Sequence, residues 1–527
     1  MNNVELRVAF EDGVEAPALE ILELRGHERV GQPYRFEVVV RAPASELAPG
    51  LADAWMNASV QLELAWTAAG ERAHRRTLYA MVDAIDDRME VASNGTRTFA
   101  LLLRPKFAEL DRFITQDIFV GATIPAVVRA KLALAQFPEA QYVMRLADEA
   151  AYLDHDGADA DLVEGRLVVQ YRESDLAFIS RLCEHVGISF FLQEGVDGDE
   201  VVFTDHDGGF TPRDAPLVFG GDGSSRGLLS LQRRLRGVKS QFFTYDYNYR
   251  TPHLTYQRDG AVLFDVLGGE AQLEVPSSGA LLEYAPNVKT PDEARFIAER
   301  RAEEEEAKRE RFVGTCIDPT VSAGQRLHVS GHPELDDDVE LLVVGVEHTF
   351  ATPTTALASG AAHAQPQYRA QLDMVRLFKK SPNGQPLSFR PERATPKPKI
   401  AGVVTGIIQS TTAEQGEGRQ HIDAQGRYLV KLHFDQGPKT MPRLRMAQPS
   451  GGAGYGHHFP LRPGAEVLVG FLDGDPDRPV ILGAVPNPLQ RSPVTVPLEH
   501  EPPEVNRIKT ISGVVFEIGD GLSRDSH

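Results

Sequence analysis

Two short acidic segments contain the residue types that bind metal ions. Residues 205–209 read Asp-His-Asp-Gly-Gly and could supply carboxylate and imidazole ligands. Residues 473–477 place aspartates at the first three acidic positions of an EF-hand loop. That loop needs glycine at its sixth position, where Arg478 stands, and glutamate at its twelfth. Because Asp-Gly and Asp-Pro pairs are ordinary in turns, we interpret both segments as turns and predict no metal or cofactor.

The sequence contains no HExxH, GxxxxGK[ST] or helix-linked GxGxxG motif and no GxSxG elbow between a strand and a helix, so no catalytic residue is predicted. His457 and His458 are adjacent, and neighbouring residues on a strand point to opposite faces, so we do not expect them to bind one metal ion together. A cell-wall or polysaccharide hydrolase is the alternative from another class of function, left open because acidic residues are plentiful. It would require a pair of carboxylates in a cleft with shifted pKa values.

The charge of the chain excludes several classes of partner. Among 527 residues, 75 are acidic and 55 are Lys or Arg, giving a formal net charge of −20. Nucleic-acid binding needs clustered basic residues, and no such block occurs, so we expect no nucleic acid partner. The same acidity disfavours docking to an anionic membrane surface. Cys183 and Cys316 form no CxxC motif, which predicts neither a disulfide framework nor a zinc site.

Three helices stand out among the elements that would position these residues. Thr123 and Ser174 are expected to cap the first two, and Gly187 to end the second. The third begins at Thr290-Pro291, a capping-box pattern, and runs towards Arg311. It contains an acidic run at residues 303–306 with basic residues within pairing distance. We interpret that run as a solvated helix face.

Most other elements are expected to be strands. Before the Pro-rich stretch at residues 381–399, a domain boundary by its composition, the patterns predict strands over 5–10, 19–25, 34–41, 98–103 and 188–192. After it, five strands separated by Gly, Pro and Asp are typical of a small barrel: 403–406, 427–434, 443–447, 466–471 and 480–482. A second Pro-rich stretch, 493–503, precedes a last strand at 514–518.

Two long stretches resemble the VgrG family. Residues 166–182, RLVVQYRESDLAFISRL, followed by Gly187-Ile188 and Phe190-Phe191, resemble the YRESDxxFxSRLxExxGI signature of VgrG-like hub domains. Beyond the linker, residues 423–435, 445–449 and 463–479 resemble the oligonucleotide/oligosaccharide-binding-like (OB-like) barrel of the phage spike. Residues 506–513 are similar to the family's entry into a trimeric β-helix. The resemblance covers nearly the whole chain in order.

The resemblance implies a mainly β fold with inserted helices. Residues 1–380 would be a phage-hub-like base of two related β-barrel domains, 381–399 a linker, and 400–490 an OB-fold-like neck. Residues 491–527 would be a connector and the start of a β-helix needle, of whose repeating valine-glycine strands this sequence has only the beginning. Because Pro493 to Glu504 is short, no lysozyme domain is expected between barrel and needle.

The implied function is structural and not enzymatic. The chain would be the spike hub of a type VI secretion system, a homotrimer that caps a hexameric, Hcp-like inner tube, punctures membranes and carries effectors. Baseplate proteins, and in some systems a PAAR-type tip protein, would be further partners. The alternative is a baseplate hub of a phage tail or an extracellular injection system. Since Met1 to Phe10 does not resemble a signal peptide, we expect cytoplasmic assembly and then export without one.

The last strand independently predicts self-association. Val514, Phe516 and Ile518 alternate with Val515 and Glu517, so one face of the strand is apolar. At ~2 kcal/mol per large exposed side chain, leaving that face in water forfeits about 6 kcal/mol. We therefore predict Val514, Phe516 and Ile518 at the subunit interface. The order of three comes from the family resemblance.

Overall fold

The computed structural model describes residues 3–11, 13–67, 74–149, 167–196, 198–220, 227–276, 278–352, 367–381, 384, 386–410, 422–435, 441–493 and 505–519. Arg166 of the quoted signature, the connector at 494–504 and the last residues, 520–527, lie outside the described residues. The chain separates into two compact units, with the main division after Lys397. The predicted domain limits at 380, 399 and 490 stay predictions.

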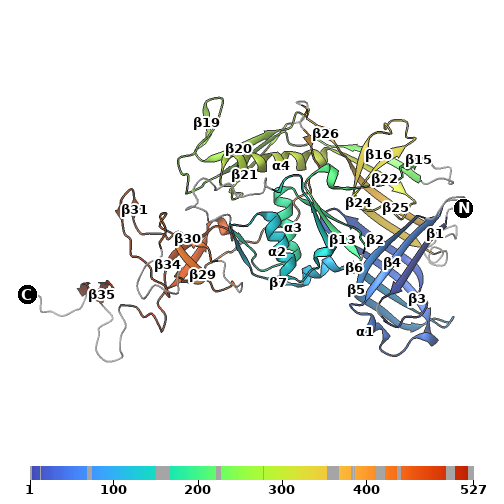
Figure 1. The fold of residues 1–527 in the computed structure, drawn as a ribbon, viewed down its shortest axis with the longest axis horizontal. Helices are drawn as coiled ribbons and strands as arrows, with labels where there is room; N and C mark the ends of the chain where they lie inside the picture. The colour runs from blue at the N-terminus through green and yellow to red at the C-terminus, as the bar shows by residue number, and fades with distance from the viewer. Residues whose placement is uncertain are drawn as a thin grey trace, which may run out of the picture. The chain divides into compact units, whose positions relative to one another are not determined.

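The first unit is built on one sheet of 13 strands (Figure 1). Its first half has the order β1 (Asn3–Phe10), β4 (Ser59–Thr67), β5 (His74–Val91), β6 (Thr96–Pro105), β3 (Gln32–Pro43) and β2 (Glu20–Arg29). Its second half continues with β24 (Glu340–Ala351), β25 (Gln367–Arg376), β22 (Glu310–Cys316), β16 (Gly227–Leu235), β15 (Leu217–Phe219), β23 (Gln325–Ser330) and β14 (Thr211–Pro212). The strands predicted at 5–10, 19–25, 34–41 and 98–103 all lie in the first half.

The two halves are joined edge to edge by β2 and β24. These strands are antiparallel, with Cα partners running from Glu23↔Ala351 to Arg29↔Gly345. Alternate residues of the neighbouring strand β3, namely Phe36, Val38 and Val40, have no exposed surface. This alternation fits the period of two of a strand whose one face packs on a core.

The three predicted helices form, and all three begin with the predicted caps. They are α2 (Ile124–Leu134), α3 (Asp175–Val186) and α4 (Pro291–Arg309). Thr123 Oγ1, Ser174 Oγ and Thr290 Oγ1 each accept a hydrogen bond from the backbone N–H three residues later. Gly187 ends α3 with φ = 80°, a left-handed conformation that glycine adopts without strain.

Helix α4 lies along a three-stranded sheet of β20 (Leu267–Gln272), β17 (Gln241–Asp246) and β21 (Ala280–Tyr284) (Figure 1). The approach is close at Gly269, where a Cβ would lie 2.2 Å from the backbone nitrogen of Arg295. Only glycine fits there, because the atom in the way belongs to the backbone of the helix. Phe242, Ala298 and Ala302 then pack in the space between helix and sheet.

Shorter elements complete the first unit. The strand predicted at 188–192 is β12 (Ser189–Glu194), in a sheet with β13 (Asp199–Thr204) and β9 (Tyr142–Arg145). The others are α1 (Leu51–Trp55), β11 (Glu173–Ser174), β18 (Tyr256–Arg258), β19 (Ala261–Phe264), β26 (Lys379–Lys380) and β27 (Pro386–Leu387), while β7 (Ile114–Thr115) lies at the border of the units. Within the described ranges, no helix is both long and apolar enough to cross a membrane.

The second unit contains the five strands predicted for the small barrel. Their order is β30 (Arg443–Leu444), β29 (Tyr428–Leu432), β28 (Val404–Ile408), β33 (Glu466–Phe471) and β34 (Pro479–Ala484). Tyr428, Val430, Val467 and Ile481 form its buried core. Strand β30 is shorter than the predicted 443–447. The unit also holds the paired strands β8 (Ile118–Val120) with β10 (Leu167–Val169), β31 (Gly451–Gly452) with β32 (Tyr455–Gly456), and β35 (Val505–Lys509) with β36 (Val515–Gly519).

Candidate functional site

The hairpin of β35 and β36 holds the three residues predicted for the subunit interface. The strands are antiparallel, with Ile508 opposite Phe516 and Arg507 opposite Glu517. Directly opposed side chains lie on the same side of a sheet, so the hairpin has two distinct faces. Arg507 and Glu517 form an ion pair of 2.8 Å on one face. The other face is mostly apolar, with Asn506 opposite Ile518.

The apolar face is not covered by other residues that the structure describes. Val514 is 66% exposed, Phe516 61% and Ile518 51%, and their place at a subunit interface stays a prediction. Ile508 joins them on this face and is 49% exposed. Ile508 was not among the interface residues predicted from the last strand. The turn signal at Gly513 could have found it, because that turn folds β35 back beside β36.

The acidic segment 473–477 is a turn between β33 and β34. Asp475 Oδ1 accepts a hydrogen bond from the backbone N–H of Asp477 at 2.9 Å. Asp477 Oδ1 accepts another from Val169 N–H at 2.7 Å, which ties β10 to the barrel. Asp473 adopts φ = 55°, a conformation found in turns. The aspartates thus hold the chain itself, as the turn interpretation predicts.

The segment 205–209 also has a structural role. Asp207 is buried, and its two carboxylate oxygens accept hydrogen bonds from the backbone N–H groups of Phe378 at 2.7 Å and Phe389 at 2.8 Å. Burial raises the pKa of Asp207. Both carboxylate oxygens of Asp207 therefore bind the backbone of the segment at residues 378–389. Among the residues that the structure describes, no group of three or more His, Cys, Asp or Glu is placed to hold a metal ion.

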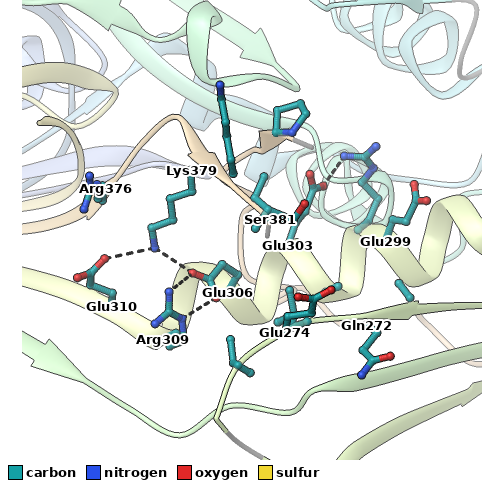
Figure 2. Close-up of a pocket in the computed structure, with 18 of the residues that line it drawn as sticks. Gln272, Glu274, Glu299, Glu303, Glu306, Arg309, Glu310, Arg376, Lys379 and Ser381 are labelled. Carbon is teal, nitrogen blue, oxygen red and sulfur yellow. Dashed lines mark hydrogen bonds and ion pairs between the residues drawn. The ribbon is translucent and has the colours of Figure 1, made fainter. Parts of the chain in front are cut away.

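A cleft of about 950 Å³ opens beside the C-terminal half of α4 (Figure 2). Acidic and basic side chains of the helix face Lys379, which lies on the segment that follows β25. Lys379 Nζ lies 3.2 Å from Glu306 Oε1 and 3.6 Å from Glu310 Oε2. Arg309 donates two hydrogen bonds of 2.7 Å to the Glu306 carboxylate. Glu306 and Glu310, two of the acids that line this cleft, are thus held in ion pairs.

The acidic run at 303–306 is not the solvated face that we predicted. Glu303, Glu304 and Glu306 are all buried. Arg390 Nε donates to Glu303 Oε2 at 2.7 Å, and Arg393 Nε to Glu304 Oε2 at 2.9 Å. The prediction was wrong because these arginines lie almost ninety residues further along the chain, where helix periodicity cannot reveal them. Their pairing makes burial of the carboxylates tolerable.

The environments of two cleft carboxylates move their pKa values in opposite directions. Burial raises the pKa of Glu303. Burial also opposes ionisation of Glu306, but the hydrogen bonds from Arg309 and the charge of Lys379 outweigh it and lower the pKa. A hydrolase pairs carboxylates in this way, but its acid must face a substrate. Here Arg300, Arg390 and the backbone N–H of Ser388 bind Glu303, so the pair stabilises the fold.

Two family models match the chain and identify its two main domains. The family model of the phage tail baseplate hub (GPD) matches residues 27–354, more than half of the chain. The chain belongs to this family. A second model, the type VI secretion system/phage-baseplate injector OB domain, matches residues 416–485. In this baseplate hub protein the OB domain therefore follows the hub, in the order that the VgrG resemblance implies.

Relatives among curated proteins include type VI secretion system spike proteins, as the VgrG resemblance predicted. Type VI secretion system spike protein VgrG4b of Pseudomonas aeruginosa is 28% identical over 499 residues, covering 91% of this chain and 56% of the relative. The actin cross-linking toxin VgrG1 of Vibrio cholerae is 25% identical and covers 79% of this chain and 36% of the toxin. This hub protein thus spans little more than half of the first relative and about a third of the second.

Solved structures share the fold. The Escherichia coli c3393 protein, a type VI secretion system component described as similar to the phage T4 tail proteins gp27 and gp5, matches with a TM-score of 0.59 and 20% identity. The match covers 92% of this chain and all of that one. A chain of the lidded Francisella PdpA-VgrG complex matches with a TM-score of 0.58 at 10% identity, covering 98% of this chain and 76% of that one. The mainly β, hub-like fold expected from the sequence is confirmed.

Proposed function

We propose that this baseplate hub protein is the structural spike hub of a type VI secretion system, and that it assembles as a homotrimer capping the inner tube. One observation carries the proposal: hub and injector OB domain occur in one chain and in sequence order, at residues 27–354 and 416–485. A spike of this kind couples a tube to a tip, and this chain carries a domain of each kind. Its work is mechanical and is performed by interfaces.

The hairpin of β35 and β36 supports self-association. An apolar face of Ile508, Val514, Phe516 and Ile518 is costly to leave in water, at about 1.5–3 kcal/mol for each large side chain. Three copies arranged around an axis would bury these faces against one another. Burial of this apolar face would thus stabilise the trimer at the point where a needle would begin.

The remaining partners follow from this role. The hub end would contact a hexameric, Hcp-like tube protein and the baseplate, and the needle end would carry effectors or a PAAR-type tip protein. The PdpA-VgrG complex, a structural neighbour, is an assembly of such a protein with another component. With a net charge of −20, nucleic acid is not among the partners. We also propose cytoplasmic assembly followed by export without a signal peptide.

We assign no catalytic role to the described residues. Glu303 and Glu306, in the cleft beside α4, are occupied by arginine and lysine side chains, so neither is free to protonate or attack a substrate. The relatives named as spike proteins support a structural role. The alternative within the same family is the baseplate hub of a phage tail or an extracellular injection system, which the fold accommodates equally.

The mass of the purified chain in solution tests the proposal. Light scattering over a range of concentrations is expected to give a species of about three times 57.9 kDa. A chain that stays monomeric at every concentration, both alone and when its C-terminus is fused to a trimeric β-helix, would refute the homotrimer. Co-sedimentation with preassembled tubes of an Hcp-like protein then tests the capping role. Binding along the tube wall instead of at its end would contradict it.

A further inference from the structure

A second hollow lies on the face of the 13-stranded sheet, apart from the cleft beside α4. It has a volume of about 370 Å³ and is lined by residues of five consecutive strands, β2, β24, β25, β22 and β16, and by the C-terminal end of α4. The strand register brings its lining together. Arg29 pairs with Gly345, Gly345 with Asp373, and Asp373 with Val313. We call this hollow the sheet basin.

The sheet basin is rich in cations, although the whole chain is strongly acidic. Its basic side chains, besides His27, are Arg29, Arg234, Arg236, Lys308 and Arg311. Only three carboxylates line it, those of Glu347, Asp373 and Glu392. Positive charge is therefore concentrated at this site in a protein with a net charge of −20. Such a concentration needs a reason, because neighbouring cations repel one another.

The few carboxylates do not neutralise the cations. Asp373 is shared by two arginines, at 3.7 Å from Arg29 Nη1 and 3.6 Å from Arg311 Nη1. Both distances are too long for a hydrogen bond. Arg234 and Arg236 form no ion pair with any residue that the structure describes. Within the described ranges, the guanidinium groups of Arg29, Arg311 and Arg236 thus donate no hydrogen bond to a carboxylate. Arg234 donates two, both to Oε1 of the Gln232 amide.

Arg311 shows how costly this arrangement is. Its side chain is largely buried, and its Nη1 atom has no hydrogen-bond partner among the described residues. Burial lowers the pKa of Arg311, and the charges of Arg29 and Arg236 lower it further, against the opposing charges of Asp373 and Glu392. A buried guanidinium without a full set of acceptors is destabilising unless another anion supplies them.

The floor of the basin is shaped by a missing side chain. Gly345 lies in β24, and Arg29 Nη1 is 3.5 Å from the position that a Cβ on Gly345 would take. Glycine leaves the guanidinium of Arg29 beside the bare backbone of β24, where an added Cβ would be in ordinary van der Waals contact with it. The basin therefore has space over a flat backbone, with cations around it.

We propose that the sheet basin is a binding site for an oxyanion, either inorganic phosphate or a carboxylate from an acidic protein segment. The planar guanidinium of arginine matches both groups, because each presents paired oxygens to its fork of N–H donors. Arg29 and Arg311 would bind the anion from the floor, and Arg234 would contact it from the rim. The site does not depend on the spike-hub assignment, since every residue belongs to one chain.

Calorimetry of the full-length chain with inorganic phosphate tests this site. With ionic strength held constant by chloride, we expect one phosphate per chain with a millimolar dissociation constant. Arg311→Gln is expected to weaken binding by about tenfold, the loss of one charge-assisted contact. Arg234→Gln, an exposed rim variant that leaves the buried part of the site intact, should weaken it several-fold. Arg295→Gln, an exposed arginine near the other end of α4, is the matched control and should bind like the parent.

A glutamate hexapeptide distinguishes the two sources of the anion. If the peptide binds and phosphate competes with it, the site accepts protein carboxylates; if phosphate alone binds, it is a site for the free ion. The inference is overturned if neither ligand binds, or if Arg311→Gln and Arg234→Gln bind both as tightly as the control. Should Arg311→Gln fail to fold, Arg234→Gln alone decides, because its side chain carries no packing role in the core.

Discussion

The hydroxyl of Tyr34 donates a hydrogen bond of 2.5 Å to Oδ2 of Asp199, a residue 165 positions further along the chain. The backbone N–H of Tyr79 reaches the other carboxylate oxygen at 3.3 Å. This contact ties β3 and β5 of the large sheet to β13. Because Asp199 lies in the interior, burial raises its pKa to about 7.

The raised pKa of Asp199 predicts a pH dependence of stability. The folded state holds its proton up to about pH 7, whereas the unfolded chain releases it near pH 4. The stabilisation is therefore complete below pH 4 and is lost as the pH rises to 7, by up to about 1.4 kcal/mol per pH unit. In urea unfolding between pH 4 and 7, Asp199→Asn should flatten this slope, and the exposed Asp86→Asn should not. Equal slopes in all three proteins would contradict the assignment.

Glu28 should be far more important than its sequence neighbourhood indicates. It pairs with Arg76 through hydrogen bonds of 2.6 and 2.8 Å, accepts a third contact from His348 at 2.8 Å, and is buried. Burial opposes its charge, yet these partners lower its pKa to about 2. Glu28→Gln leaves a buried arginine without its counter-charge and should cost about 3–5 kcal/mol of unfolding free energy.

The next arginine supplies a matched control for Glu28. Arg75 pairs with Glu63 at 2.8 Å, but its side chain is 65% exposed. Glu63→Gln should therefore cost less than about 1 kcal/mol. The Glu28 contribution should also disappear as the pH falls from 4.5 towards 2, because its lowered pKa stabilises the fold only while the carboxylate is ionised. Similar losses in the two variants would argue against a buried pair.

The two faces of the C-terminal hairpin should respond differently to a charge. Phe516→Asp and Ile518→Asp place a carboxylate on the apolar face and should weaken trimer formation by at least tenfold in dissociation constant, measured by analytical ultracentrifugation. Val515→Asp introduces the same group on the face that already holds the Arg507–Glu517 pair. It should leave the mass unchanged. A fully trimeric Phe516→Asp would reject the strand register as the basis of assembly.

The acidic run of α4 should tolerate change only where it faces water. Glu303→Gln removes the charge that holds Arg390 and Arg300, and should lower the unfolding free energy by about 2–4 kcal/mol. Glu299→Gln, one turn earlier on the exposed side, should cost less than about 0.5 kcal/mol. Thermal unfolding of the two variants distinguishes these outcomes. Equal midpoints for Glu303→Gln and Glu299→Gln would indicate that the acidic run is a solvated helix face, as first predicted.

Features decided within a few residues could be predicted from the sequence. The caps at Thr123, Ser174 and Thr290 form because each side chain bonds to a backbone group three residues away. The five barrel strands were found because alternation and turn residues are also local. The turn at residues 473–477 was also predicted from local sequence, where it had been weighed against a metal-binding loop. Asp475 and Asp477 are turn residues in both sequence and structure.

What was missed depends on distant partners. Nothing near Glu303 indicates that Arg390 will bind it, and nothing near Arg29 indicates that cations from β16, β22 and α4 will gather around it. The pairing of Ile508 with Phe516 was within reach, because only the turn at Gly513 separates the strands. It was overlooked because β35 follows a proline-rich stretch that carries no strand pattern.

The pairing of β2 with β24 forms late during synthesis of the chain on the ribosome, because the two strands are far apart in the sequence. Glu23 finds its partner only when Ala351 has been synthesised, and at roughly 5–20 residues per second that delay is on the order of tens of seconds. Throughout this interval β2 is a bare edge with unpaired N–H and C=O groups, open to the same edge of another nascent copy. A chaperone that shields residues 20–29 during translation would therefore raise the yield of correctly folded chains more than one acting after release.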